Sequence, residues 1–191
     1  SGNSNPEDTH EKGVAFLMTR KSKKALLGWN PISPRIITAR FNSRFQKTTF
    51  FQVYAPTNDA KDDDKEDFYQ SLQTAIDKVP KRDLLLLMGD FNAKVGAVRE
   101  GREREIGPHG IGQMNENGEL LSDLCATNSL VIGGTLFPHK NCHKVTWVSP
   151  AGNAQNQIDH IVISKRWRSS LQDVRVKRGA DLASDHHLLQ G

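Results

Sequence analysis

The chain has 191 residues, of which 36% are apolar and 25% charged, and its formal net charge is +4 at pH 7. This composition fits a folded protein with a sizeable core and excludes a disordered or membrane-spanning chain, since no apolar run reaches the length of a bilayer span. The modest positive charge permits a polyanionic partner without requiring one.

Nothing in the sequence looks like a linker, so we expect a single domain over residues 1–191. Residues 1–11 are polar and show no periodicity, which predicts an irregular lead-in. No signal peptide precedes the first apolar run, and we therefore expect an intracellular protein whose two cysteines, Cys125 and Cys142, are free thiols.

In the first half of the chain, apolar and β-branched runs predict four strands, at residues 13–19, 35–41, 48–54 and 84–88. Prolines predict a turn between the first two strands, after a basic loop at 20–24, and the second and third strands should form a hairpin around the polar loop 42–47. The fourth strand lacks polar alternation, so it should be buried. Between the last two strands, apolar residues at helical spacing predict an amphipathic helix over 62–79 with an acidic start that suits the helix dipole.

In the second half, glycines and the arginines Arg99, Arg102 and Arg104 predict a flexible basic loop that either contacts a phosphate backbone or is merely solvated. A helix capped by Asn117 should follow, with Cys125 on its apolar face. Further strands are expected at 131–132, 144–148, 158–163 and 171–178, followed by a loop at 179–183.

Three short motifs place an acid beside an apolar strand: Gly89-Asp90-Phe91-Asn92, Ile158-Asp159-His160 and Ser184-Asp185-His186. A buried carboxylate costs several kcal/mol unless it is paired, so Asp159 should pair with a histidine of the last motif. Together the motifs supply carboxylates for a hard cation, a histidine and an acid to orient it, which is what phosphodiester hydrolysis needs. An ordinary Asp/Asn turn is the alternative for the first motif taken alone.

A second cluster, made of His139, Cys142 and His143, does not predict zinc, because no paired spacing supplies a fourth ligand.

The three motifs, with Tyr54 and Thr146-Trp147, resemble the endonuclease/exonuclease/phosphatase superfamily. Longer runs, among them GDFNAKVG, NQIDHI and GADLASDHHL, resemble the endonuclease domain of RTE-type non-LTR retrotransposons and the related craniofacial development protein 2-like proteins. The resemblance implies a four-layer α/β sandwich, with two mainly antiparallel sheets and outer helices.

The resemblance also implies roles for single residues. Asp90 would align the attacking water, Asn92 would support the metal or the transition state, and Asp159 would orient His186. The remaining family roles are Tyr54 on the phosphate and Asp185 on Mg²⁺, or on Mn²⁺ in its place, with help from Asn92 and Asp90. We expect the substrate to contact Tyr54, Asn92, Trp147, Arg99 and Arg102, the two arginines because they lie in the basic loop.

The family has an Asn and a metal-binding Glu on two strands that precede the segment matching Gly13, and its last strand continues beyond the segment matching Leu189. We therefore expect a domain trimmed at both ends, with little cleavage by itself and a tendency to self-associate through an unpaired sheet edge.

The function implied is a Mg²⁺-dependent nuclear endonuclease that nicks DNA and leaves a 3′-hydroxyl for reverse transcription, with a reverse transcriptase domain in the same polyprotein. Two alternatives stay open: another phosphoesterase of the superfamily, and a non-catalytic domain that binds DNA or protein.

Overall fold

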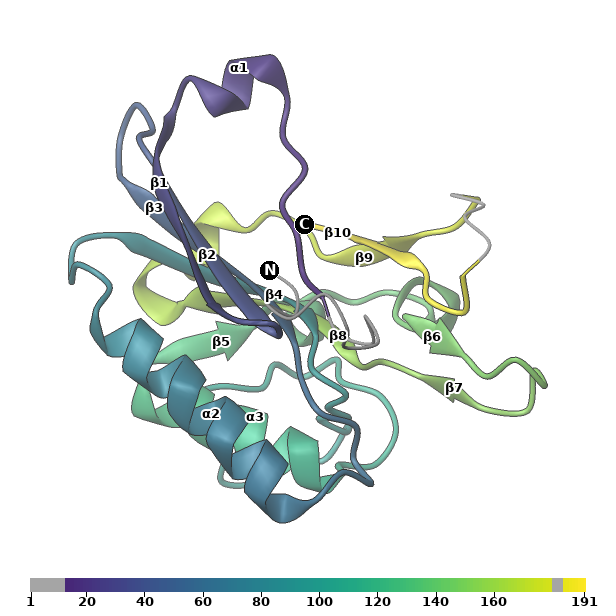
Figure 1. Cartoon of the computed structure of the whole chain (residues 1–191). Helices are drawn as coiled ribbons and strands as arrows, with labels where there is room; N and C mark the ends of the chain where they lie inside the picture. Colours follow the sequence, from purple (N-terminus) through teal and green to yellow (C-terminus); the bar gives the residue numbers. More distant parts are fainter. Residues whose placement is uncertain (1–12, 180–183) are drawn as a thin grey trace. The chain divides into compact units, whose positions relative to one another are not determined.

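The computed structural model describes residues 13–179 and 184–191 (Figure 1). The chain divides into two compact units, of which the first ends at Gly89 and the second begins at Asp90. The lead-in expected over residues 1–11 and most of the loop expected over 179–183 lie outside the described residues.

The first unit is a sheet with helices, and its strands follow the order β1-β2-β3-β4. Its elements are α1 (Arg20–Lys23), β1 (Leu26–Ser33), β2 (Ile36–Phe41), β3 (Thr48–Tyr54), α2 (Asp62–Asp77) and β4 (Leu84–Asp90). The predicted hairpin of β2 and β3 is confirmed, because the two strands pair antiparallel from Ile36 opposite Val53 to Phe41 opposite Thr48.

Burial in the first unit follows the expected periodicities. Alternate residues of β3 are buried, and α2 buries Phe68, Leu72 and Ile76, which lie at helical spacing on one face. In β4 the buried residues are Leu85 and Leu87, while their neighbours are half-buried. The apolar stripes of helix and strand therefore form the core of this unit.

Gly89 lets β4 lie close to β3 just before the chain reaches Asp90. Its φ is +136°, and a Cβ at this position would lie 2.0 Å from the carbonyl oxygen of Val53. Only glycine fits such a backbone conformation and such a contact. The residue type at 89 is thus fixed by the approach of the two strands.

The N-terminal part of the prediction was wrong in three places. Residues 13–19 form no strand, because an apolar run needs a neighbouring backbone to pair with and none of the described residues supplies one. The basic segment contains the short helix α1, capped by the Thr19 hydroxyl, which accepts from the Ser22 N–H. Pro31 lies inside β1 and not in a turn, which an edge strand tolerates because one of its sides is unpaired.

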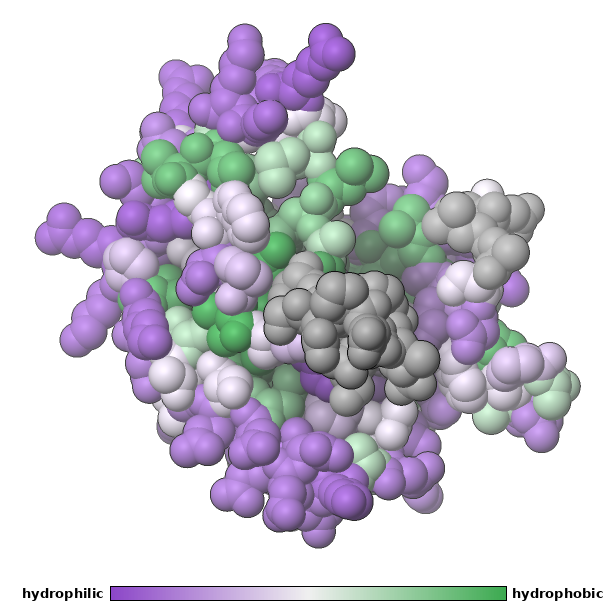
Figure 2. Space-filling view, in the orientation of Figure 1, coloured by the Kyte–Doolittle hydropathy of each residue, from purple (hydrophilic) through white to green (hydrophobic). Residues whose placement is uncertain are grey.

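Hydrophobic side chains gather on one face of the first unit, next to the hydrophilic tip that contains α1 (Figure 2). Leu17, Leu27 and Trp29 are exposed there, and Phe16 and Met18 help to line a shallow pocket of about 500 Å³. Exposed apolar surface of this kind commonly marks a contact surface. The self-association expected from the sequence stays a prediction.

The second unit contains α3 (Glu116–Thr127) and six short strands. Its elements after α3 are β5 (Leu130–Ile132), η1 (Gly133–Thr135), η2 (Asn141–His143), β6 (Trp147–Val148), β7 (Gln155–Asn156), β8 (Asp159–Ser164), η3 (Lys165–Ser170), β9 (Arg175–Lys177) and β10 (Leu188–Gln190). β5 pairs antiparallel with β8, and β6–β7 and β9–β10 form two-stranded sheets that lie at the same end of this unit (Figure 1).

Several details of the second unit differ from the sequence prediction. The strands expected over 144–148 and 171–178 shrink to two and three residues. Helix α3 is capped by Asn115, and Asn117 lies inside the helix, fully buried. Cys125 is buried on α3, and both cysteines are free, as predicted. None of the helices in the described residues is long and apolar enough to cross a membrane.

A buried ion pair fixes the start of β4 in the first unit. The Asp83 side chain is buried and accepts from Arg40 Nε at 2.7 Å, Arg40 Nη2 at 2.9 Å and the Thr49 hydroxyl at 2.8 Å. The hydrogen bonds from Arg40 hold the pKa of Asp83 below its ordinary value. A lowered carboxyl pKa stabilises the fold above the unfolded pKa, and this contribution is lost as the pH falls through the folded pKa.

We expect Asp83→Ala to lower the free energy of unfolding by about 1 to 3 kcal/mol at pH 7, since it leaves Arg40 and Thr49 without their acceptor while Arg40 stays partly hydrated. Urea denaturation would measure this loss, which should shrink as the pH falls below the ordinary carboxyl pKa of about 3.9. The matched control is Asp77→Ala, since Asp77 on α2 only accepts from Gln73 at an exposed position. Equal losses in the two variants would contradict the assignment.

Candidate functional site

Three chain segments of the second unit bring two carboxylates and an imidazole together. Asp90 ends β4, Asp159 begins β8, and His186 precedes β10. Each offers a ligand atom within 4.8 Å of the other two, and all three side chains are partly buried. The residues come from the three motifs that the sequence singled out.

Asp159 and His186 form the predicted pair. The Nδ1 of His186 lies 3.0 Å from Oδ2 of Asp159. With an ionised Asp159, Nδ1–H donates and the hydrogen bond fixes which nitrogen carries the proton. The other nitrogen, Nε2, lies 4.0 Å from Oδ2 of Asp90. The imidazole is therefore held by one carboxylate and presents its second nitrogen to the other.

Thr146 organises this pair, a role that the sequence did not reveal. Its buried hydroxyl accepts from the backbone N–H groups of Ile158 and Asp159, each at 3.0 Å, and its carbonyl accepts from the His187 N–H at 2.7 Å. One residue thus bonds both to the strand that carries Asp159 and to the segment that carries His186. The sequence singled out Thr146 only as part of the Thr146-Trp147 pair that resembles the family, without a role.

The pKa values of His186 and Asp90 are both raised above their ordinary values. The hydrogen bond from Asp159 raises the pKa of His186 above its ordinary value. Burial and the charge of Asp159 raise the pKa of Asp90 to about 6, against a hydrogen bond from the Asn92 N–H to Asp90 Oδ1 at 2.8 Å. A carboxylate with so high a pKa gains most from a nearby cation or proton donor.

The turn after Asp90 is fixed by buried polar side chains. Asn92 has φ of 49°, and its carbonyl accepts from the side-chain amides of Asn115 at 3.0 Å and Asn117 at 3.3 Å. His160, fully buried, bonds through Nε2 to the Ala93 carbonyl at 2.7 Å, and burial lowers the pKa of His160. A neutral His160 with its proton on Nε2 donates to that carbonyl. His160 therefore positions the turn, a role that its place in the Ile158-Asp159-His160 motif did not reveal.

Asp185 and Trp147 lie beside the three central residues. The Trp147 Nε1–H donates to Asp185 Oδ2 at 2.8 Å, and this hydrogen bond lowers the pKa of the exposed Asp185 carboxyl. The Val148 N–H donates to the Asp185 carbonyl at 3.0 Å, and the backbones of Trp147 and His186 form an isolated antiparallel β-bridge. Trp147 thus positions the Ser184-Asp185-His186 motif, and its indole N–H is hydrogen-bonded to Asp185.

The other predicted substrate contacts are not members of this cluster. Tyr54 ends β3 in the first unit, where the Arg35 guanidinium lies 5.0 Å from its ring centre. Arg102 donates to Asp123 on α3 at 2.7 Å, and Arg99 is half-buried in the same glycine-rich loop. The roles proposed for these side chains stay predictions.

The residues present fit a hard divalent cation. Asp159 and His186 satisfy each other, which leaves the oxygens of Asp90, and of Asp185 nearby, as ligands. A magnesium ion is typically bound by one or two carboxylates and keeps several waters. Burial and then the charge of Asp159 raise the pKa of Asp90, and a bound cation would favour its ionised form.

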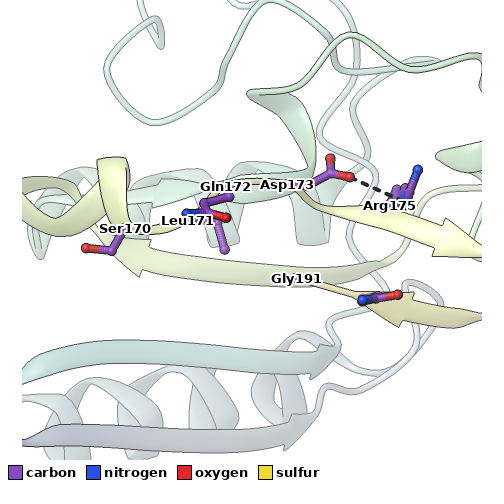
Figure 3. A pocket seen from close by; sticks show the side chains of 7 residues that line it. Ser170, Leu171, Gln172, Asp173, Arg175 and Gly191 are labelled. Atoms are coloured by element: carbon purple, nitrogen blue, oxygen red, sulfur yellow. Dashed lines mark ion pairs between the residues drawn. The ribbon is translucent and has the colours of Figure 1, made fainter. Parts of the chain in front are cut away.

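A separate cavity of about 390 Å³ lies in the second unit, between residues 170–175 and the end of the chain (Figure 3). Asp173 pairs there with Arg175 at 3.2 Å and with His139 at 2.5 Å. Asp90, Asp159 and His186 do not line this cavity, so we do not include it in the candidate site.

Comparisons with known proteins show the chain's relatives. Residues 48–190 match the family model described as endonuclease-reverse transcriptase. The chain is 39% identical over 187 residues to craniofacial development protein 2 of Tragulus javanicus, covering 96% of this chain and 32% of that protein, so it spans about a third of the relative's length.

Solved structures show the same fold class that the sequence predicted, the α/β sandwich of this superfamily. The endonuclease domain of TRAS1, a telomere-specific non-LTR retrotransposon, has a TM-score of 0.58 at 17% identity, covering 82% of this chain and 62% of that one. A variant of the 3′ phosphatase NExo from Neisseria, bound to product DNA hairpin, has a TM-score of 0.62 at 20% identity, covering 86% and 69%.

We expect the pKa of His186 in the metal-free protein to lie above the ordinary histidine value of about 6.5, and to fall in Asp159→Asn because the charged acceptor is lost. Two-dimensional ¹H–¹⁵N NMR of the imidazole rings would follow this titration. A raised histidine pKa stabilises the fold fully below the unfolded pKa, and the contribution is lost as the pH rises through the folded pKa. Identical pKa values in the parent and the variant would contradict the assigned pairing.

Proposed function

Because the chain belongs to the endonuclease/exonuclease/phosphatase superfamily, we propose that it is a Mg²⁺-dependent DNA endonuclease that nicks its target and leaves a 3′-hydroxyl for reverse transcription. The observation that carries this proposal is the imidazole of His186, held by Asp159 at 3.0 Å with its second nitrogen 4.0 Å from Asp90. The family description and the TRAS1 structure support DNA as substrate, a reverse transcriptase domain in the same polyprotein and action in the nucleus.

The side chains divide the proton chemistry of hydrolysis between them. Asp90, whose pKa is raised to about 6, accepts a proton from the attacking water at a carboxylate oxygen. His186, whose pKa is also raised, donates its Nε2 proton to the departing 3′ oxygen as negative charge develops there. Asp159 stabilises the imidazolium through Nδ1–H without itself taking the proton. The bond between phosphorus and the 3′ oxygen then breaks, which leaves the 3′-hydroxyl.

The remaining residues bind metal and substrate. Asp185, with help from Asn92 and Asp90, would hold Mg²⁺ or Mn²⁺, and the cation would supply a Lewis acid for the phosphate oxygens. The resemblance to the family is the support for a contact of Tyr54 with the phosphate, and Trp147, Arg99 and Arg102 are the side chains that we propose to contact DNA.

In the full-length protein, we expect His186→Ala to lower the rate of plasmid nicking by roughly 10²- to 10⁴-fold, the usual contribution of a positioned acid or base. His187→Ala is the matched control, because it removes the neighbouring imidazole while the backbone bond from His187 to Thr146 is kept. The measurement is the conversion of supercoiled to open-circular plasmid in Mg²⁺, with EDTA as the blank. The nicked ends would then be extended by a DNA polymerase, which requires a free 3′-hydroxyl.

Each unexpected outcome of this assay is informative. Equal rates in His186→Ala and His187→Ala would refute the role of His186. Release of inorganic phosphate from a 3′-phosphorylated oligonucleotide without nicking would favour a phosphomonoesterase. DNA binding by the full-length parent without any product in Mg²⁺ or Mn²⁺ would favour the non-catalytic alternative.

Binding of the cation has its own test. We expect Asp90→Asn and Asp185→Asn each to weaken Mn²⁺ binding by roughly tenfold or more, since changes outside the ligand shell alone cost roughly 10- to 100-fold. Electron paramagnetic resonance of free Mn²⁺ would measure the affinity independently of cleavage. The control is Asp123→Asn on α3, because its carboxylate pairs with Arg102. Unchanged Mn²⁺ affinity in both site variants would place the cation elsewhere.

A further inference from the structure

A second pocket lies in the first unit, at the opposite end of β4 from Asp90. Its volume is about 480 Å³, and its walls are the loop between β2 and β3 and the segment that precedes β4. Cavities of this size commonly accept small ligands or single nucleotides. The residues that line it are Arg40, Asn42, Ser43, Phe45, Gln46, Lys47, Pro80, Lys81, Arg82 and Asp83.

The lining is strongly cationic. The lining contains one carboxylate, that of Asp83, and four basic side chains, those of Arg40, Lys47, Lys81 and Arg82. Asp83 is buried, and its carboxylate oxygens accept hydrogen bonds from Arg40 and Thr49. The lining therefore contains more basic than acidic side chains, and those of Lys47, Lys81 and Arg82 are exposed to solvent. A polyanion is therefore the partner that this pocket favours.

Hydrogen bonds hold the two walls of the pocket together. The Gln46 side-chain amide donates to the Arg82 carbonyl, and the Leu84 N–H donates to the Lys47 carbonyl at 2.9 Å. Arg40 uses two of its five N–H donors on Asp83, which fixes the guanidinium in place and leaves three donors. The basic side chains therefore line a pocket whose two walls are joined by hydrogen bonds.

An exposed aromatic ring completes the pocket. Phe45 is 87% exposed, and the guanidinium of Arg44 lies 5.4 Å from its ring centre. An aromatic face beside several cations is the usual composition of a site for single-stranded nucleic acid, in which bases stack on the ring and cations contact the phosphates. An acidic peptide would use the cations without the ring, and a duplex keeps its base faces stacked.

We propose that this pocket is a second, non-catalytic site that binds single-stranded nucleic acid. It goes beyond the nicking function, because none of its residues belongs to the catalytic cluster. A strand bound here is held by the same molecule that binds duplex at the catalytic site.

The test is fluorescence anisotropy with labelled oligo(dT)₂₀ and oligo(U)₂₀ in EDTA, so that no cleavage takes place. We expect the triple variant Lys47→Glu/Lys81→Glu/Arg82→Glu to bind at least tenfold more weakly. Its slope of log affinity against log salt should be flatter by roughly 2, since each phosphate contact contributes about 0.7 on a single strand. Phe45→Ala should bind at least fivefold more weakly with an unchanged slope, as loss of base stacking requires.

Matched controls make the result specific. The triple variant Lys21→Glu/Lys23→Glu/Lys24→Glu changes the same charge around α1 and should keep most of the affinity. Plasmid nicking and the melting temperature should match the parent in the pocket variants. Equal losses in both triple variants, parental affinity in Phe45→Ala, or full displacement of the oligonucleotide by poly-glutamate would each overturn the proposal.

Discussion

A carboxylate embedded in an apolar strand has to be paired, and in this protein the pairing of Asp159 with His186 at 3.0 Å governs the arrangement of the site. The partner comes from the last segment of the chain, so the site forms only when that segment closes onto β8. Thr146 and Trp147 hold this closure through the backbone and the Asp185 carboxylate. Stability and chemistry therefore depend on the same few hydrogen bonds.

The two central carboxylates have different environments although they lie close together. Asp159 is matched by an imidazole, whereas burial and the charge of Asp159 raise the pKa of Asp90 to about 6. One acid is thereby a fixed hydrogen-bond partner of the imidazole, and the other gains or loses a proton near neutral pH. Two residues of identical type acquire separate tasks from their surroundings alone.

The sequence predicted those features that depend on local pattern or on one strong requirement. Helix α2, the β2–β3 hairpin and the partner of Asp159 followed from periodicity and from the cost of a buried charge. Residues 13–19 were wrongly predicted as a strand, because strand formation depends on a partner that local composition cannot show. His160 and Thr146 were missed for the same reason, since their acceptors and donors lie far along the chain.

The turn that contains Asn92 is hydrogen-bonded to the start of α3. In the sequence, the basic loop lies between these two segments. The N–H of Lys94 donates to the Asn115 side chain at 2.8 Å, and the Asn115 N–H donates to the Lys94 carbonyl at 3.0 Å. The twenty or so intervening residues begin and end at these two hydrogen bonds, and their middle is also bonded into the second unit, since the Ile132 N–H donates to the Glu105 carbonyl at 2.9 Å and the His109 N–H donates to the Thr135 carbonyl at 3.0 Å. A change of length in this segment therefore has to keep both the Lys94–Asn115 pair and these inner contacts, which leaves its exposed stretches as the places where insertions are tolerated.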